Sequence, residues 1–251
     1  MSKGDPWKGY RDFTKARIAL GRAGGSLTTE ERLAFRRDHA LARDAVWSEL
    51  DTGSLLTQIH EMGYDTMLLR SQAIDREQYI QRPDLGRLLD AESEESLQKQ
   101  QSGYDISICL VDGLSAMAIA QHALPFLRCL LPLLKGYTIG PLAVVQQGRV
   151  AIGDPIGQHN QCQVCVVLIG ERPGLTSPYS MGAYMTYSPK GGLTDERRNC
   201  ISNIRTEGLS YERAAQKLCF LITEAIRRKL SGVDLKDTYE DQLLNYDRTK
   251  E

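Results

Sequence analysis

Apolar, β-branched runs alternate with amphipathic segments through the second half of the chain. The run from Val164 to Ile169 contains no polar residue, which is typical of a strand buried on both faces. The same texture predicts strands at 106–111, 137–146, 148–152, 164–169, 183–187 and 201–205. It also predicts a short helix or turn at 154–160 and a long helix at 211–230. Strands that alternate with helices predict an α/β fold, with a Rossmann-like, doubly wound and mostly parallel sheet.

The first hundred residues have mainly helical patterns. Thr28 and Glu31 have the spacing of a capping box, so they predict the start of a helix. Residues 64–69 form a short extended piece, and Pro83 is placed to begin another helical segment. The glutamate-rich stretch 90–101 is the best candidate boundary. We therefore expect a helical domain at 1–100 and an α/β domain at 101–251, with a frayed or partner-bound tail after residue 230.

Composition narrows the class of protein. The 251 residues are 41% hydrophobic and 25% charged, which is ordinary for a globular protein with a packed core. A net charge of −1 supplies no field to attract nucleic acid. The apolar stretch 116–134 is interrupted by polar residues and two prolines, so it predicts a buried helix or helix pair and no membrane span. The first twenty residues lack the apolar core of a secretory signal, and we expect a cytoplasmic protein.

Six cysteines are expected to be reduced in that compartment. Cys162 and Cys165 have the spacing of half a zinc site, but alternation along a strand would point them to opposite faces, and we expect no metal. Cys200 follows Arg197 and Arg198, which could lower its pKa and make it a nucleophile. No motif links it to any of the four histidines, His39, His60, His122 and His159. A buried, inert cysteine that contacts a ligand is therefore the better interpretation.

Two loops follow predicted strands, where open α/β sheets bind ligands. Glu171 and Arg172 lie in a Gly/Pro-rich loop after the strand 164–169, as ligand contacts or as a surface ion pair. The loop 112–115 either holds an anion at a helix N-terminus or simply caps that helix through Ser115, and the residues alone favour capping.

Several ungapped words, in a consistent order, give the chain a resemblance to a known family. They are ARIALGRAGG at 16–25, RPDLGR at 82–87, VDGLS at 111–115, GRVAIGD at 148–154, GERPGL at 170–175, YSP at 187–189 and CISNI at 200–204. These words resemble the light chain, or small subunit, of ethanolamine ammonia-lyase, an adenosylcobalamin-dependent enzyme. The resemblance covers roughly residues 15 to 235, and the set of words is far more specific than any one of them.

The resemblance implies a radical deamination of ethanolamine to acetaldehyde and ammonia, with chemistry that the cofactor supplies. It implies that Val150, Glu171 and Cys200 contact the cofactor, and that loop 112–115 contacts its side chains or nucleotide tail. Adenosylcobalamin would be base-on, since the chain lacks the Asp-x-His-x-x-Gly signature that supplies a histidine to cobalt. Catalytic and substrate-binding residues would belong to the large subunit, with none in this chain. The family assembles as six small and six large subunits, and enclosure in a bacterial microcompartment stays open.

Two other classes of function compete with this interpretation. A self-sufficient α/β enzyme with Cys200 as its nucleophile predicts activity without any partner. A cofactor-free assembly protein predicts that a charge change at Glu171 leaves cofactor affinity unaltered.

Overall fold

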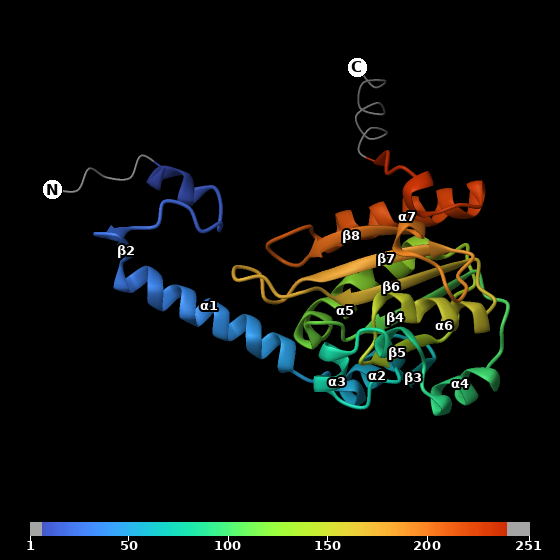
Figure 1. Cartoon of the computed structure of the whole chain (residues 1–251). Coiled ribbons are helices and arrows are strands. Elements are labelled where there is room, and N and C mark those ends of the chain that lie inside the picture. Colours follow the sequence, from blue (N-terminus) through green and yellow to red (C-terminus); the bar gives the residue numbers. More distant parts are fainter. Residues whose placement is uncertain (1–6, 240–251) are drawn as a thin grey trace, which may run out of the picture.

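A six-stranded sheet forms the centre of the computed structural model, which describes residues 7–239 (Figure 1). In spatial order its strands are β3 (Thr66–Arg70), β5 (Leu142–Gln146), β4 (Ile106–Val111), β6 (Val164–Gly170), β7 (Met181–Tyr187) and β8 (Arg198–Ile204). The first four are parallel, β7 is antiparallel to β6, and β8 is antiparallel to β7. The predicted α/β fold with a mostly parallel sheet is confirmed.

Helices cover both faces of the sheet, so two apolar cores form. One face packs against α2 (Thr52–Glu61), α5 (Ala116–Leu130) and α7 (Tyr211–Arg228). The other packs against α4 (Ala91–Gln98) and α6 (Gly153–His159). Every residue of β4 and of β6 is buried, as the unbroken apolar pattern of these strands requires. Short α3 (Arg76–Gln81) and the 3₁₀ turns η2 (Leu85–Arg87) and η3 (Leu131–Leu134) complete the connections.

The predicted buried helix at 116–134 is confirmed as α5 followed by η3. By length and composition this segment passes the test for a membrane span, and it is the only one to do so among residues 7–239. It packs against β4, β6, β7 and α7, and most of its large apolar side chains lie in the core.

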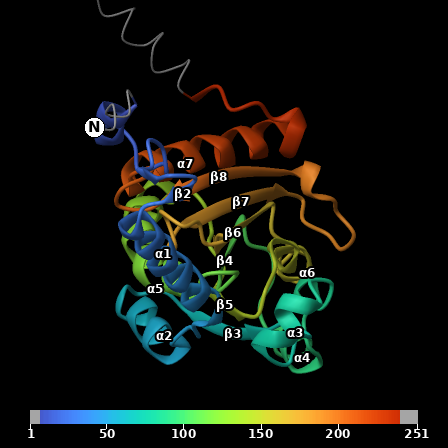
Figure 2. The same cartoon turned by 60° about the vertical axis from the view of Figure 1, so that its left-hand side comes forward.

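The N-terminal segment forms an arm that extends from the body of the molecule. It comprises η1 (Lys8–Asp12), the small hairpin β1 (Arg22–Ala23) and β2 (Ser26–Leu27), and α1 (Thr29–Trp47) (Figures 1 and 2). Thr28 caps α1 as predicted, because its hydroxyl accepts a hydrogen bond from the Glu31 backbone N–H at 3.4 Å. The Glu31 carboxylate pairs with Arg11 at 2.8 Å, so the reciprocal half of the predicted capping box is not seen.

Two predicted strands need correction, and the predicted domain boundary needs a remark. Residues 148–152 do not form a strand: they turn into η4 (Val150–Ile152), and α6 follows directly. The strand predicted at 137–146 begins only at Leu142. The sheet also crosses the boundary predicted at residue 100, because β3 pairs with β5 along its whole length. The division into two domains stays a prediction.

The start of the tail is held against the sheet. The Asn199 side chain on β8 accepts a hydrogen bond from Gly232 N at 2.7 Å and donates one to Leu235 O at 2.8 Å, on either side of η6 (Gly232–Asp234). The prediction of a frayed tail is therefore wrong for residues 231–239. The rest of the tail lies outside the described residues.

Candidate functional site

A pocket of about 390 Å³ lies where the carboxyl ends of β4, β5 and β6 meet. Parallel strands end at the same edge of a sheet, so the loops that follow them converge there. Its lining residues come from the loops after β4, β5 and β6, from the end of β6, from α3 and from β7. They are Tyr79, Leu114, Arg149, Val150, Ile169, Gly170, Glu171, Arg172 and Tyr184. Two of the three predicted cofactor contacts, Val150 and Glu171, thus line one pocket.

Glu171 is fixed by its neighbours and is not paired with Arg172. The Ser180 hydroxyl donates to Glu171 Oε2 at 2.5 Å, and the Asn203 backbone N–H donates to the same atom at 3.2 Å. The Glu171 N–H in turn donates to Ser180 O at 2.8 Å. Arg172 is exposed at the pocket wall. The surface ion pair considered from the sequence is therefore absent from the described residues, and the carboxylate is preorganised toward the pocket.

Cys200 lies next to the pocket and not in its lining. It stands opposite Tyr184 in the β7–β8 pairing, so the two side chains lie side by side on one face of the sheet. Tyr184 lines the pocket, so Cys200 contacts the site through this ring. On this side of the sheet α6 packs against β4 and β6, whereas Cys200 on β8 is exposed, so the prediction of a buried cysteine is wrong. The three predicted residues are consequently grouped around one hollow, with Cys200 at its rim.

The structure does not favour Cys200 as a nucleophile. Although the residue is exposed, the protein atoms around its sulfur partly desolvate the thiol and raise its pKa; the contact with Tyr184 lowers the pKa, and the nearby Glu171 carboxylate raises it. Arg198, which the sequence suggested as an activator, binds Asp154 on α6 through two hydrogen bonds of 2.7 and 2.8 Å. Arg197 pairs with Asp234 at 3.5 Å. None of the four histidines, all within the described residues, forms a hydrogen bond with Cys200.

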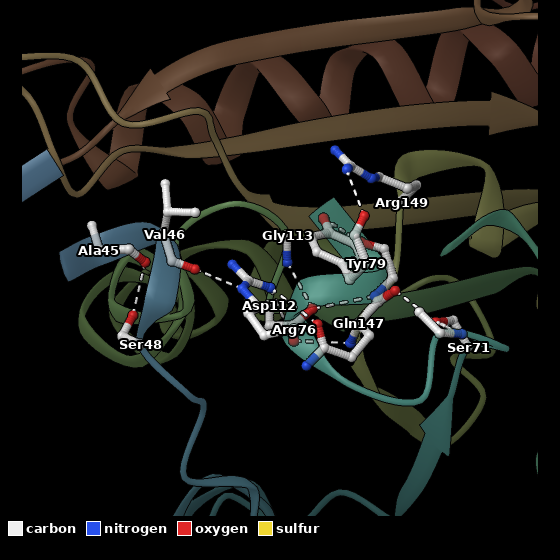
Figure 3. A network of polar contacts seen from close by, with 12 residues as sticks. Ala45, Val46, Ser48, Ser71, Arg76, Tyr79, Asp112, Gly113, Gln147 and Arg149 are labelled. Atoms are coloured by element: carbon white, nitrogen blue, oxygen red, sulfur yellow. Dashed lines mark hydrogen bonds and ion pairs between the residues drawn. The ribbon is translucent and has the colours of Figure 1, made fainter. Parts of the chain in front are cut away.

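Arg149 and Tyr79 form a wall that the sequence interpretation missed (Figure 3). The Arg149 guanidinium lies 4.2 Å from the centre of the Tyr79 ring and donates to Tyr79 O at 3.0 Å. The Tyr79 hydroxyl donates to Gly148 O at 3.1 Å, which ties α3 to the residue before Arg149. The position of Arg149 directly before Val150 in the GRV word was an available signal, since adjacent residues of a turn can face one ligand.

Asp112 explains why the chain turns at 147–148 and does not continue as a strand. Its carboxylate accepts hydrogen bonds from the backbone N–H groups of Gly113, Gln147 and Gly148 at 2.8, 2.8 and 3.2 Å. Arg76 adds an ion pair at 3.8 Å (Figure 3). Burial raises the pKa of Asp112 to about 6, and these donors and Arg76 oppose the rise. This cluster sets the conformation that delivers Arg149 and Val150 to the pocket.

In loop 112–115 the Ser115 side chain does not cap α5, and the Gly113 and Leu114 N–H groups bind within the protein. The Leu114 N–H donates to Gly170 O at 2.9 Å, and the Ser115 hydroxyl donates to Pro178 O at 3.1 Å. Gly113 has a φ of 59°, and a Cβ there would lie 2.3 Å from Gly170 O. The loop therefore fastens the end of β4 to the end of β6. Capping through the Ser115 side chain is wrong, and contact of this loop with a ligand stays a prediction.

A second hollow of about 530 Å³ begins at Ala151, the residue after Val150. It is lined by the η2 segment, by α6 and by the loop 191–195. The Arg198–Asp154 pair borders it and joins β8 to α6. Val150 lines the first hollow and Ala151 lines the second, so η4 contributes to the walls of both.

The remaining cysteines considered from the sequence are buried. Cys162 precedes β6, so strand alternation does not apply to it, and it packs in the same apolar cluster as Cys165. Burial raises the pKa of Cys162 to about 12. The Cys165 sulfur lies 4.0 Å from that of Cys109.

Comparison with known proteins agrees with the motif resemblance. The family model described as ethanolamine ammonia-lyase light chain matches residues 4–236. The chain is 52% identical over 242 residues to a protein of Azotobacter vinelandii named ethanolamine ammonia-lyase small subunit, covering 94% of this chain and 90% of that protein. A protein of the same name from Pseudomonas fluorescens is 50% identical over 249 residues, covering 97% of this chain and 91% of that protein. One from Ralstonia nicotianae is 50% identical over 250 residues, covering 97% of this chain and 93% of that protein. The chain belongs to the ethanolamine ammonia-lyase light chain family.

Proposed function

We propose that this chain binds adenosylcobalamin at an interface with the large subunit of ethanolamine ammonia-lyase, for the conversion of ethanolamine to acetaldehyde and ammonia. One observation carries the proposal: Val150, Glu171 and the Tyr184–Cys200 pair are distant in sequence but surround one depression at the carboxyl edge of the sheet. Relatives at about half identity carry the name of this enzyme's small subunit.

The residues present suit a large ligand with an apolar body and an amide-rich periphery. Val150 supplies apolar contact, and the Glu171 carboxylate can accept hydrogen bonds from amide or ribose groups. Tyr184 offers a ring face beside the small, polarisable Cys200 side chain. η4 contributes a wall to each of two hollows, and a partner on the other side would complete the enclosure.

In this proposal the chain binds, orients and shields, and it carries no catalytic residue. When bound, the cofactor supplies the radical that begins substrate deamination. The chain lacks an Asp-x-His-x-x-Gly signature, so the cofactor keeps its own base as the lower ligand of cobalt. Glu171 is already held by Ser180 and Asn203, so little conformational freedom is lost when it accepts a ligand group.

The arm 7–47 is the proposed docking element for the large subunit. Only Glu31 and Ala45 of α1 are buried, whereas Leu33, Phe35 and Trp47 are 57%, 40% and 53% exposed. Apolar side chains of this size on a projecting helix indicate a covered surface. We expect an assembly of six small and six large subunits in the cytoplasm. The native mass of the complex tests this stoichiometry.

Reconstitution tests the proposed function. The purified chain, the large subunit and adenosylcobalamin are combined singly, in pairs and together, and ethanolamine-dependent ammonia release is measured. We expect activity only with all three components, the visible spectrum of a base-on cofactor, and an affinity for adenosylcobalamin that falls about tenfold or more on Glu171→Gln. Activity of this chain alone, or an unchanged affinity in Glu171→Gln, contradicts the proposal.

A matched pair of variants tests the docking element. Phe35→Glu on α1 should prevent co-purification with the large subunit, because it places a charge in the buried interface. Ile74→Glu changes an equally apolar side chain that is 67% exposed on the body of the molecule, and it should leave co-purification intact. Equal recovery of the complex with both variants would refute the assignment of α1.

A further inference from the structure

We propose that Arg149 binds the phosphodiester of the cofactor's nucleotide tail, which makes it a specificity-determining residue. The inference rests on the proposed function and adds to it a residue and a chemical group. It stems from the hydrogen bonds, stacking and charges around Arg149 (Figure 3).

Arg149 has donor capacity that the protein does not use. One terminal nitrogen donates to Tyr79 O at 3.0 Å, but the buried Nε has no hydrogen-bond partner. Among residues 7–239 no carboxylate forms an ion pair with Arg149, although the chain is rich in such pairs elsewhere. Because Nε is enclosed by protein atoms, the donor that an anion in the pocket can reach is the other terminal nitrogen, Nη1, which forms no hydrogen bond with residues 7–239.

The guanidinium is also held in place before any ligand arrives. Its plane lies 4.2 Å from the centre of the Tyr79 ring, a cation–π contact. The Arg149 backbone N–H donates to Gly86 O at 2.7 Å, and a Cβ on Gly86 would approach the Arg149 side chain to 2.8 Å. Fixed on both backbone and side chain, the planar donor group is preorganised for an oxygen acceptor.

The local charge balance favours an anion. Arg76 lies over the same Tyr79 ring at 4.7 Å, and its partner is Asp112 at 3.8 Å. Two guanidinium groups and one carboxylate leave an excess of one positive charge when all are ionised. Burial lowers the pKa of Arg76, and Arg149 contributes to the lowering, as expected for two cations that repel each other. The other two charged residues of the lining, Glu171 and the exposed Arg172, do not pair with each other, but their opposite charges leave this excess unchanged.

Phosphate is the group in adenosylcobalamin that matches these features. The amide side chains and sugar hydroxyls of adenosylcobalamin are neutral. Its phosphodiester carries a negative charge on oxygen atoms, which can accept two parallel hydrogen bonds from an arginine. Free inorganic phosphate offers the same chemistry, so an experiment must separate the two sources.

The test uses spectroscopic titration to measure the equilibrium affinity for three corrinoids. The assembled complex is compared between the wild type and Arg149→Gln. Adenosylcobalamin has both phosphate and base, adenosylcobinamide phosphate has the phosphate without the base, and adenosylcobinamide lacks both. We expect Arg149→Gln to lose about 10- to 100-fold in affinity for the first two and to leave the third unchanged. Arg149→Lys, which keeps the charge and loses the fork, should lie between them. Arg128→Gln, an exposed arginine on α5 that does not line either hollow, is the matched control and should match the wild type.

The outcomes separate this inference from the proposed function. Equal losses for all three corrinoids, or no loss for any, would overturn the role of Arg149. Stabilisation by inorganic phosphate that depends on Arg149, with corrinoid affinities unchanged, would assign the site to free phosphate and also overturn it. If Glu171→Gln still weakens adenosylcobalamin while Arg149→Gln does not, only the present inference fails. If Arg149→Gln does not assemble, the same comparison is made with Arg149→Lys.

Discussion

The Arg198–Asp154 ion pair gives the sharpest prediction about what holds the depression open. Their side chains are only 2% and 4% exposed, and two hydrogen bonds of 2.7 and 2.8 Å join them. Asp154→Asn keeps the shape of the side chain but removes its charge and turns one acceptor into a donor that faces the guanidinium. Breaking one partner of a buried pair typically costs about 3–5 kcal/mol, because the other charge stays buried.

Two neighbours limit the loss. Arg198 also donates to Asp195 Oδ1 at 3.0 Å and to Thr186 Oγ1 at 3.1 Å, so part of its charge and hydrogen bonding stays compensated. We therefore expect Asp154→Asn to lose about 3 kcal/mol of unfolding free energy, the lower end of that range. Asp195→Asn, whose side chain is 78% exposed, should lose at most about 1 kcal/mol.

Urea unfolding followed by circular dichroism measures these differences as shifts of the midpoint at constant slope. The double variant Asp154→Leu with Arg198→Met removes both charges, and it should be more stable than either single variant. Asp154→Leu, Arg198→Met and their combination form a double-mutant cycle with the wild type. A loss of unfolding free energy below about 1 kcal/mol in Asp154→Asn, or strictly additive effects in this cycle, would refute the view that this buried pair joins β8 to α6.

Further predictions address the pocket floor and the cysteine. Gly113→Ala should lose about 2 kcal/mol or more in urea unfolding, since φ is 59° and the new Cβ meets a carbonyl oxygen at 2.3 Å; Gly25→Ala, with no atom within 4 Å, should change little. Burial raises the pKa of Asp112 to about 6, above its value in the unfolded chain, so its contribution to stability is complete below about pH 4 and is lost as pH rises through 6. The unfolding free energy of the wild type minus that of Asp112→Asn should fall by about 2–3 kcal/mol from pH 4 to 7. A rise of this difference with pH would contradict the prediction. Because burial raises the pKa of Cys200, iodoacetamide should alkylate it more slowly at pH 7 than a free thiol, and more slowly still in Tyr184→Phe, as peptide mass spectrometry can determine; faster labelling would show an activated thiolate.

The sequence predicted those parts of the fold that local patterns determine. The unbroken apolar runs of β4 and β6 are buried on both faces, and the amphipathic pattern of α7 places Leu218, Ile222 and Ala225 in the core. The run 148–152 is β-branched yet forms a 3₁₀ turn, because the distant Asp112 carboxylate binds the N–H groups of residues 147 and 148. A side chain 35 residues earlier in the chain overrides local propensity there, and no window of sequence contains that information.

The candidate site also combines residues that the sequence predicted with contacts that only the structure shows. Val150, Glu171 and Cys200 were named through motif resemblance, and the fold then brings them together around one hollow. The bracing of Glu171 by Ser180 and Asn203 depends on the bend after β6 and on a register shift between β7 and β8. The stack of Tyr79 with Arg149 depends on α3 lying against the loop after β5. Such tertiary contacts have no periodic signature, so they emerge only from the structure.

The central claim is that the depression between η4 and β7 holds adenosylcobalamin against the large subunit. The most direct test is an experimental structure of the assembled complex with the cofactor bound. The account predicts the corrinoid in contact with Val150, Glu171 and the Tyr184–Cys200 pair, with its own base on cobalt and α1 buried against the large subunit. A cofactor enclosed by the large subunit alone, with these residues still open to solvent, would contradict it.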